Sequence, residues 1–183
     1  MSSQSVEQST KTSAPEQSKP LKAKLFSWTK DIVIMGVVIS ALFAWQGRNL
    51  LDDDGTVVIP EQNFVTLQGD VFSLQKSNKK TVMYFFAPWC SICRYSISNL
   101  SIIDESEYNV VRVALDYSST EEVQQFIDGV GVSGTVLMGN NVHKDMFNIN
   151  AYPTYYVLDE ALQVVANDMG YSSTLGLKMR TSF

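Results

Sequence analysis

The stretch TVMYFFAPWCSIC, residues 81–93, decides the fold. The apolar run TVMYFFA at its start is rich in aromatic and β-branched side chains, which is typical of a strand buried on both faces of a sheet. The segment CSICRYSISNLSII, residues 90–103, has helical spacing, because Cys93, Ile97 and Leu100 fall on one stripe. The sequence therefore predicts a buried strand that runs into a helix, with two cysteines at the start of that helix.

Composition limits the chemistry that these cysteines can perform. The chain has 183 residues, 45% of them apolar, so an ordinary core can form. Two cysteines are too few for a disulfide framework, and two cysteines with one histidine are too few for a closed zinc site. A net charge of −5 without a basic stripe argues against a nucleic-acid partner.

The spacing of the cysteine pair favours redox chemistry. Residues i and i+3 on a helix are neighbours, within the approach that a disulfide needs. Cys90 at the open helix terminus should be exposed, and the unpaired N–H groups there favour its thiolate, whereas Cys93 on the core stripe should be shielded. The alternative is a structural disulfide, but a bridge that closes so short a loop stabilises a fold little.

The rest of the domain alternates strands and helices. A hairpin is predicted around Gln68, Gly69 and Asp70, because two short apolar stretches flank them. Further predicted elements are a strand at 108–118, a helix at 119–131, two closing strands at 154–160 and 162–168, and a final helix on which Leu175, Met179 and Phe183 are spaced by four. Together they predict an α/β sheet with helices on its faces.

The N-terminal part differs in composition. Residues 1–24 predict a disordered cytoplasmic tail, and residues 25–47 an uncleaved transmembrane anchor. As a helix, residues 25–45 would rise about 31 Å, enough to span a hydrocarbon core, and the stretch from Ile32 to Trp45 carries no charge. A cleaved signal peptide and a buried soluble helix are the alternatives. The lysines before the apolar stretch predict a cytoplasmic N-terminus, so residues 48–56 would form a linker and residues 57–183 an exported domain.

The segment VMYFFAPWCSIC resembles the active-site strand and turn of the thioredoxin superfamily. The anchor, the hairpin and the long interval to YPTYYVLD resemble its membrane-tethered TlpA/DsbE-like branch. The ending GYSSTLGLKMR and the aromatic Tyr95 are most similar to the suppressor-of-copper-sensitivity D type of protein disulfide oxidoreductase. The resemblance covers residues 56–183 and implies a thioredoxin-like fold with an N-terminal β-hairpin extension, preceded by a single transmembrane helix.

The resemblance also implies the site residues. Cys90 and Cys93 match the catalytic pair, and Pro153 matches a cis-proline that faces it in this superfamily. Trp89, Tyr152 and Pro153 would then bind substrate, with the Tyr152 backbone pairing with an extended segment beside Cys90. The alternative for Pro153 is an ordinary trans-proline at a strand start. No cofactor or metal is implied.

Two positions depart from the family pattern. Tyr84 stands where thioredoxin buries an aspartate, and Ser96 where many TlpA-like members carry a glutamate, so no carboxylate is evident to take the proton of Cys93. Ser91 and Ile92 separate the cysteines, without the histidine of strongly oxidising members, which favours reduction or exchange. His143 lies outside the motif and is predicted to be a solvated loop residue.

These features predict a single-pass, membrane-anchored thiol–disulfide oxidoreductase with an exported C-terminal domain. The resemblance implies that the membrane is a bacterial inner membrane and that the domain is periplasmic. Cys90 would attack a protein disulfide and Cys93 would resolve the mixed disulfide. The expected partners are periplasmic proteins with disulfides and membrane lipid around the anchor, and the resemblance implies a membrane thiol reductant as electron donor. The alternative is a copper-binding or copper-tolerance module that uses the same thiolates, since soft sulfur ligands suit Cu(I).

Overall fold

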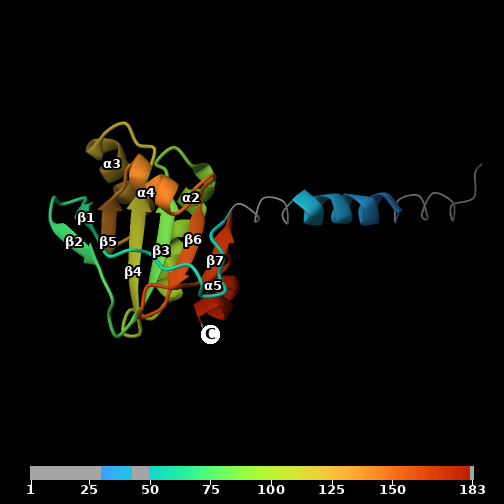
Figure 1. Cartoon of the computed structure of the whole chain (residues 1–183). Helices are drawn as coiled ribbons and strands as arrows, with labels where there is room; N and C mark the ends of the chain where they lie inside the picture. Colours follow the sequence, from blue (N-terminus) through green and yellow to red (C-terminus); the bar gives the residue numbers. More distant parts are fainter. Residues whose placement is uncertain (1–29, 43–49, 182–183) are drawn as a thin grey trace, which may run out of the picture. The chain divides into compact units, whose positions relative to one another are not determined.

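The computed structural model describes residues 30–42 and 50–181, and the side chains up to Met179 (Figure 1). The chain divides into two units, Met1–Ala44 and Trp45–Phe183. Residues 30–42 are helical with exposed apolar side chains. No helix within the described ranges is both long and apolar enough to cross a membrane. The predicted tail and both ends of the predicted anchor lie outside the described residues.

A seven-stranded mixed sheet forms the domain within residues 50–181, in the order β2-β1-β5-β4-β3-β6-β7. Its centre is parallel, since β4 pairs with both β3 and β5 in that orientation, and all other pairs are antiparallel. The strands are β1 (Gln62–Thr66), β2 (Val71–Leu74), β3 (Lys80–Phe86), β4 (Tyr108–Ala114), β5 (Thr135–Met138), β6 (Thr154–Leu158) and β7 (Val164–Met169). The β1–β2 hairpin confirms the predicted extension, and its turn contains Gly69 at φ 92°.

Strand β3 lies between β4 and β6 and contributes to cores on both faces of the sheet. Tyr84 and Phe86 pack in one core with the helices that follow the cysteines, whereas Met83 and Phe85 pack in the other core with Phe147. These four side chains are fully buried. This two-sided burial explains why the strand reads as a continuous apolar run and not as an alternating one.

The helices of the domain are α2 (Ser91–Ser96), α3 (Thr120–Val130), α4 (Asn141–Met146) and α5 (Thr174–Thr181), with a 3-10 segment, η1 (Ile97–Ile102), directly after α2. The predicted helix 119–131 is confirmed. Its first turn is capped by Ser119, whose side chain accepts the N–H of Glu122, and it ends at Gly131 in the left-handed region.

The predicted helix after the cysteines and the predicted final helix are both present, but each shows a feature that the sequence did not indicate. The helix after the cysteines changes to 3-10 geometry at Ile97, in a serine-rich segment of low helix propensity. On α5 the buried residue is Leu177, whereas Leu175 and Met179 are exposed. A spacing of four defines a stripe on a helix, but it does not say which stripe faces the sheet.

Residues 50–56, predicted to form part of a linker, contact the domain. The N–H of Leu51 donates to the Tyr156 hydroxyl at 3.1 Å, and its carbonyl accepts from the Asn167 side chain at 2.9 Å. Farther along, the N–H of Gly55 donates to the carbonyl of Val164. Ordered packing on the sheet therefore begins before Val57.

Helix α4 was not predicted, and it changes the interpretation of His143. That residue is half-buried at the third position of α4, not in a solvated loop. Its Nδ1 accepts the N–H of Asn140 at 3.1 Å, while the Asn140 side chain accepts the N–H of His143, so the two form a capping box. Its ring also stacks on Phe64 at 4.2 Å between centroids. His143 therefore helps to cap the N-terminus of α4.

This capping box should make stability depend on pH. Burial lowers the pKa of His143, and its acceptor Nδ1 requires the neutral ring. The contribution is thus fully present above the unfolded pKa of about 6.5 and is lost as pH falls through the lower folded value. We expect His143→Gln, which keeps an acceptor at this position, to flatten the pH dependence of the urea midpoint below about pH 6.5. An equal slope in both proteins would contradict this role.

Candidate active site

Cys90 and Cys93 lie where β3 ends and α2 begins. Cys90 is the N-cap of α2, and its Sγ accepts the N–H of Cys93 at 3.1 Å. The two residues form a disulfide with their Cα atoms 5.3 Å apart. Cys93 is fully buried and Cys90 is 7% exposed. The predicted order of exposure is confirmed, but Cys90 is less open than expected, because its sulfur is bonded to one that lies in the core.

The surroundings of Cys90 favour a thiolate once the disulfide is reduced. The Cys93 N–H already points at its sulfur, and the first turn of α2 contains no acidic residue that would oppose a negative charge. Hydrogen bonding to the charged form of a group favours that form. Cys93 has no comparable position, since its side chain faces the core formed with Ile97 and Leu100. The two sulfurs are therefore chemically different.

The segment before β6 lies beside Trp89, the residue that precedes the cysteine pair. The Tyr152–Pro153 peptide bond is cis, as the resemblance implied. The Trp89 and Tyr152 rings meet edge to face with centroids 5.7 Å apart. Trp89 is 63% exposed, which leaves most of its ring available to another molecule. The structure thus brings two of the predicted substrate-binding residues, Trp89 and Tyr152, into contact.

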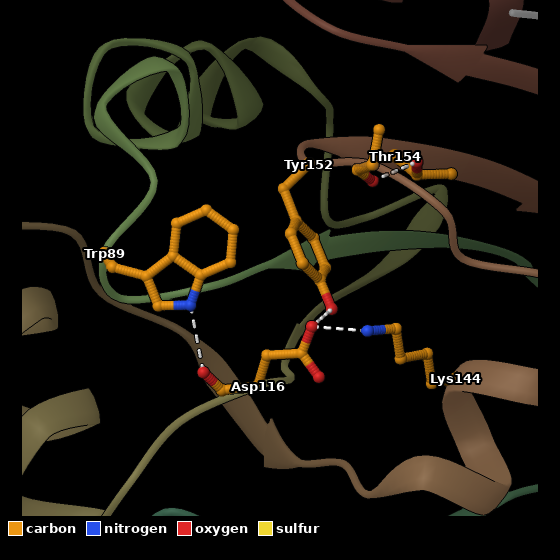
Figure 2. Close-up of polar contacts among 6 residues, drawn as sticks. Trp89, Asp116, Lys144, Tyr152 and Thr154 are labelled. Atoms are coloured by element: carbon orange, nitrogen blue, oxygen red, sulfur yellow. Dashed lines mark hydrogen bonds and ion pairs between the residues drawn. The ribbon is translucent and has the colours of Figure 1, made fainter.

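Asp116 links these two residues to α4, as Figure 2 shows. The Trp89 indole N–H donates to the Asp116 carbonyl at 3.0 Å, and the Tyr152 hydroxyl donates to its carboxylate at 2.9 Å. The Lys144 ammonium forms an ion pair with the same carboxylate oxygen. Asp116 has φ 49°, a left-handed conformation that asparagine and aspartate tolerate better than most residues. One residue therefore holds Trp89, Tyr152 and Lys144 together.

The electrostatics of this cluster follow from its contacts. Burial alone would raise the pKa of the Asp116 carboxyl, but the hydrogen bonds from Lys144 and Tyr152 outweigh it and leave the pKa below its usual value. Burial raises the pKa of Tyr152, and the hydrogen bond to Asp116 adds to the effect. Tyr152 therefore remains a neutral donor and Asp116 a charged acceptor at neutral pH.

Sequence reasoning missed Asp116 and Lys144, although a signal for Asp116 was present. Strands β3 and β4 are parallel, so the residues just after them emerge at the same edge of the sheet. Ligand sites in open α/β sheets lie at these carboxyl ends. The polar residue Asp116, two positions after β4 ends at Ala114, could have been placed near Trp89 on that ground. Lys144 gave no such signal, because α4 was not predicted.

The two residues that depart from the family pattern, Tyr84 and Ser96, contact each other beside the Cys93 carbonyl. The Tyr84 hydroxyl lies 2.9 Å from the Ser96 Oγ and donates to the Cys93 carbonyl at 3.2 Å. Both residues are fully buried, and burial raises the pKa of Tyr84. At the two positions where the resemblance implied carboxylates, this chain therefore holds a pair of neutral hydroxyls.

Removing the Tyr84 hydroxyl should destabilise the fold. In Tyr84→Phe the buried Ser96 hydroxyl and the Cys93 carbonyl lose a partner, at an expected cost of about 1–2 kcal/mol. Tyr95→Phe is the matched control, because Tyr95 is 74% exposed. Urea unfolding of both variants, with the disulfide intact, checks the difference. Equal stabilities of the two variants would show that the buried hydroxyl pair does not support the turn after Cys93.

A metal centre has no support from the described part of the chain. No group of three or more His, Cys, Asp or Glu residues within it could hold a metal ion. His143 caps α4 and stacks on Phe64, so its ring is already engaged.

The mixed sheet and the Cys-x-x-Cys pair at the start of α2 define a thiol–disulfide oxidoreductase with a thioredoxin fold. Comparison with known proteins agrees. The chain is 30% identical over 142 residues to a thioredoxin-like protein of Haemophilus influenzae, covering 74% of this chain and 84% of that one. It therefore belongs to the family of thioredoxin-like proteins.

Two further comparisons point the same way. The chain is 27% identical over 142 residues to the thioredoxin-like protein YneN of Bacillus subtilis, covering 69% of this chain and 83% of that one. The crystal structure of StoA from Bacillus subtilis superposes with a TM-score of 0.61 at 20% identity, covering 68% of this chain and 98% of that one, and it shows the fold. No family model matches the sequence.

Proposed function

We propose that this oxidoreductase is tethered to a membrane and acts on protein disulfides in the reducing or exchange direction. The observation that carries the proposal is the position of Cys90, which caps α2 with the Cys93 N–H directed at its sulfur. In the reduced protein, that N–H and the start of the helix stabilise the Cys90 thiolate. Ser91 and Ile92 between the cysteines add no positive charge that would stabilise the thiolate further, which favours the reducing direction.

The reaction that we propose is a two-step exchange. The Cys90 thiolate attacks one sulfur of a substrate disulfide, forms a mixed disulfide and releases the other substrate sulfur as a thiolate, which takes up a proton. Cys93, once deprotonated, attacks Cys90 Sγ and releases the second substrate thiol. The substrate gains two electrons and the chain is left with the Cys90–Cys93 disulfide, as described here. A dithiol reductant at the membrane would return the pair to the reduced state.

Exposed apolar side chains around Cys90 support a protein substrate. Trp89, Ile92 and Tyr95 are 63%, 49% and 74% exposed, although each is large and apolar. Exposed apolar groups that gather at one place mark sites where another molecule binds. With Trp89, Tyr152 and Pro153 as the substrate-binding residues, an extended segment would lie across them and pair with the Tyr152 backbone.

An insulin-reduction assay tests this function directly. The reduced protein should accelerate precipitation of the insulin chains in the presence of a dithiol reductant. A parallel titration with Cu(I) separates the enzyme from a copper-binding module. Tight copper binding without any acceleration would overturn the proposal in favour of the copper module.

The tether is a separate prediction. The apolar stretch of residues 25–47 and the preceding lysines support a single-pass anchor with a cytoplasmic N-terminus, a periplasmic domain and the bacterial inner membrane as location. We expect a reporter that is active only outside the cytoplasm, fused after Phe183, to give signal, and the protein to stay with membranes through a high-pH wash. Recovery of a soluble form that starts near Gln46 would show that the segment is a cleaved signal peptide.

A further inference from the structure

A cavity lies away from the cysteines, on the face of the sheet that carries η1 and α3. It has a volume of about 330 Å³ and is bounded by η1, by the segment after α3 and by the β4 residue Arg112. Three serines line it, Ser98, Ser101 and Ser133, together with Glu105. A volume of this size is at the lower end of what small-molecule sites occupy.

Arg112 is an unusual residue for its position. It stands in the central strand β4, between Val111 and Val113, and is 3% exposed. Its Nε and Nη1 have no hydrogen-bond partner among the described residues, and no carboxylate in that part of the chain forms an ion pair with it. Gly134 makes room for the guanidinium, since a Cβ at that position would lie 2.5 Å from Nη1. The core therefore accommodates the Arg112 guanidinium but provides no hydrogen-bond partner for its Nε and Nη1.

A buried, unpaired guanidinium destabilises the fold unless another group pairs with it. An arginine stays charged in a protein, and a buried charge without a partner destabilises the fold. The negative charge that acts on Arg112 at neutral pH is that of Glu105, which is itself exposed. The missing partner is therefore an anion that enters the cavity from solvent.

We infer that this cavity binds a small carboxylate, with the Arg112 guanidinium as its anchor. The planar guanidinium presents two parallel N–H groups to the two oxygens of a carboxylate, and serine hydroxyls can supply further hydrogen bonds. A single cation facing Glu105 disfavours anions of higher charge, such as phosphate. The site is separate from the cysteine pair, and it requires no redox activity.

Ligand-observed saturation-transfer NMR on the full chain, with sodium acetate as the probe at constant ionic strength, tests the inference. We expect a saturable acetate signal with a dissociation constant on the order of 1 mM, as fits so small a ligand. Arg112→Met should abolish the signal. If that variant does not fold, Arg112→Lys, which keeps the charge without the planar pair of donors, should weaken binding about tenfold.

Glu105→Gln provides the complementary variant, because it removes the negative charge from an exposed position and should tighten acetate binding several-fold. Phosphate should bind more weakly than acetate to the wild-type chain. An acetate signal that does not saturate, or that survives in Arg112→Met, would overturn the inference. Binding that appears only in Glu105→Gln would show that Glu105 itself fills the site, and tighter binding of phosphate would refute the carboxylate.

Discussion

Cys93→Ala is expected to accumulate mixed disulfides with substrate proteins, whereas Cys90→Ala should capture almost none. Cys90 caps α2 with the N–H of residue 93 directed at its sulfur, so its thiolate still forms and attacks when Cys93 is absent. Nothing then resolves the adduct. In Cys90→Ala the remaining thiol lies in the core with no exposed surface, and a substrate disulfide cannot reach it.

The comparison requires each variant to be expressed in its native compartment, quenched with acid and examined on non-reducing gels. The double variant Cys90→Ala with Cys93→Ala sets the background. Mass spectrometry of the trapped species should place the mixed disulfide on Cys90. If Cys90→Ala captures substrates and Cys93→Ala does not, the roles of the two sulfurs are the reverse of those assigned here.

Asp116→Gly is expected to lower kcat/KM for insulin by about 10-fold to 100-fold, because a binding surface that is misplaced by a fraction of a nanometre costs that much. The substitution removes the carboxylate that holds Tyr152 and Lys144 while glycine still permits the left-handed backbone. A small disulfide that needs the Cys90–Cys93 pair but not the surface around Trp89 and Tyr152 should be reduced at a nearly unchanged rate.

Two further variants separate the causes. Asp116→Asn retains an acceptor for the Tyr152 hydroxyl but loses the ion pair with Lys144, so its activity should lie between those of wild type and Asp116→Gly. Asp128→Asn, on the exposed face of α3, serves as the control and should behave as wild type. Equal losses for insulin and for the small disulfide would mean that Asp116 acts on the cysteines themselves and does not organise a substrate surface.

The parts of this fold that the sequence could predict are those with a strong local pattern. Strand β3 is a continuous apolar run, α3 has a cap and a terminal glycine, and the β1–β2 hairpin has a glycine turn. Each of these local patterns is enough to predict its own strand, helix or turn. The cysteine pair was equally clear, because its spacing and its place after β3 follow from the sequence alone.

The parts that could not be predicted depend on contacts between distant segments. Strand β5 has four residues and α4 has six, too few to show a period. His143 caps α4 through Asn140 and stacks on Phe64, which lies far away in the sequence. The Tyr84–Ser96 contact looked like two separate departures from a family pattern until the fold placed them together.

The reduction potential of the Cys90–Cys93 couple tests the central claim most directly, because it separates a redox-active pair from a structural disulfide. Equilibration with glutathione or dithiothreitol buffers, read by alkylation and mass, gives the value. An active exchange pair should lie between about −120 and −270 mV, and the reducing direction proposed here predicts the end of that range near about −270 mV. A potential below about −300 mV, which is typical of structural disulfides, would contradict the account.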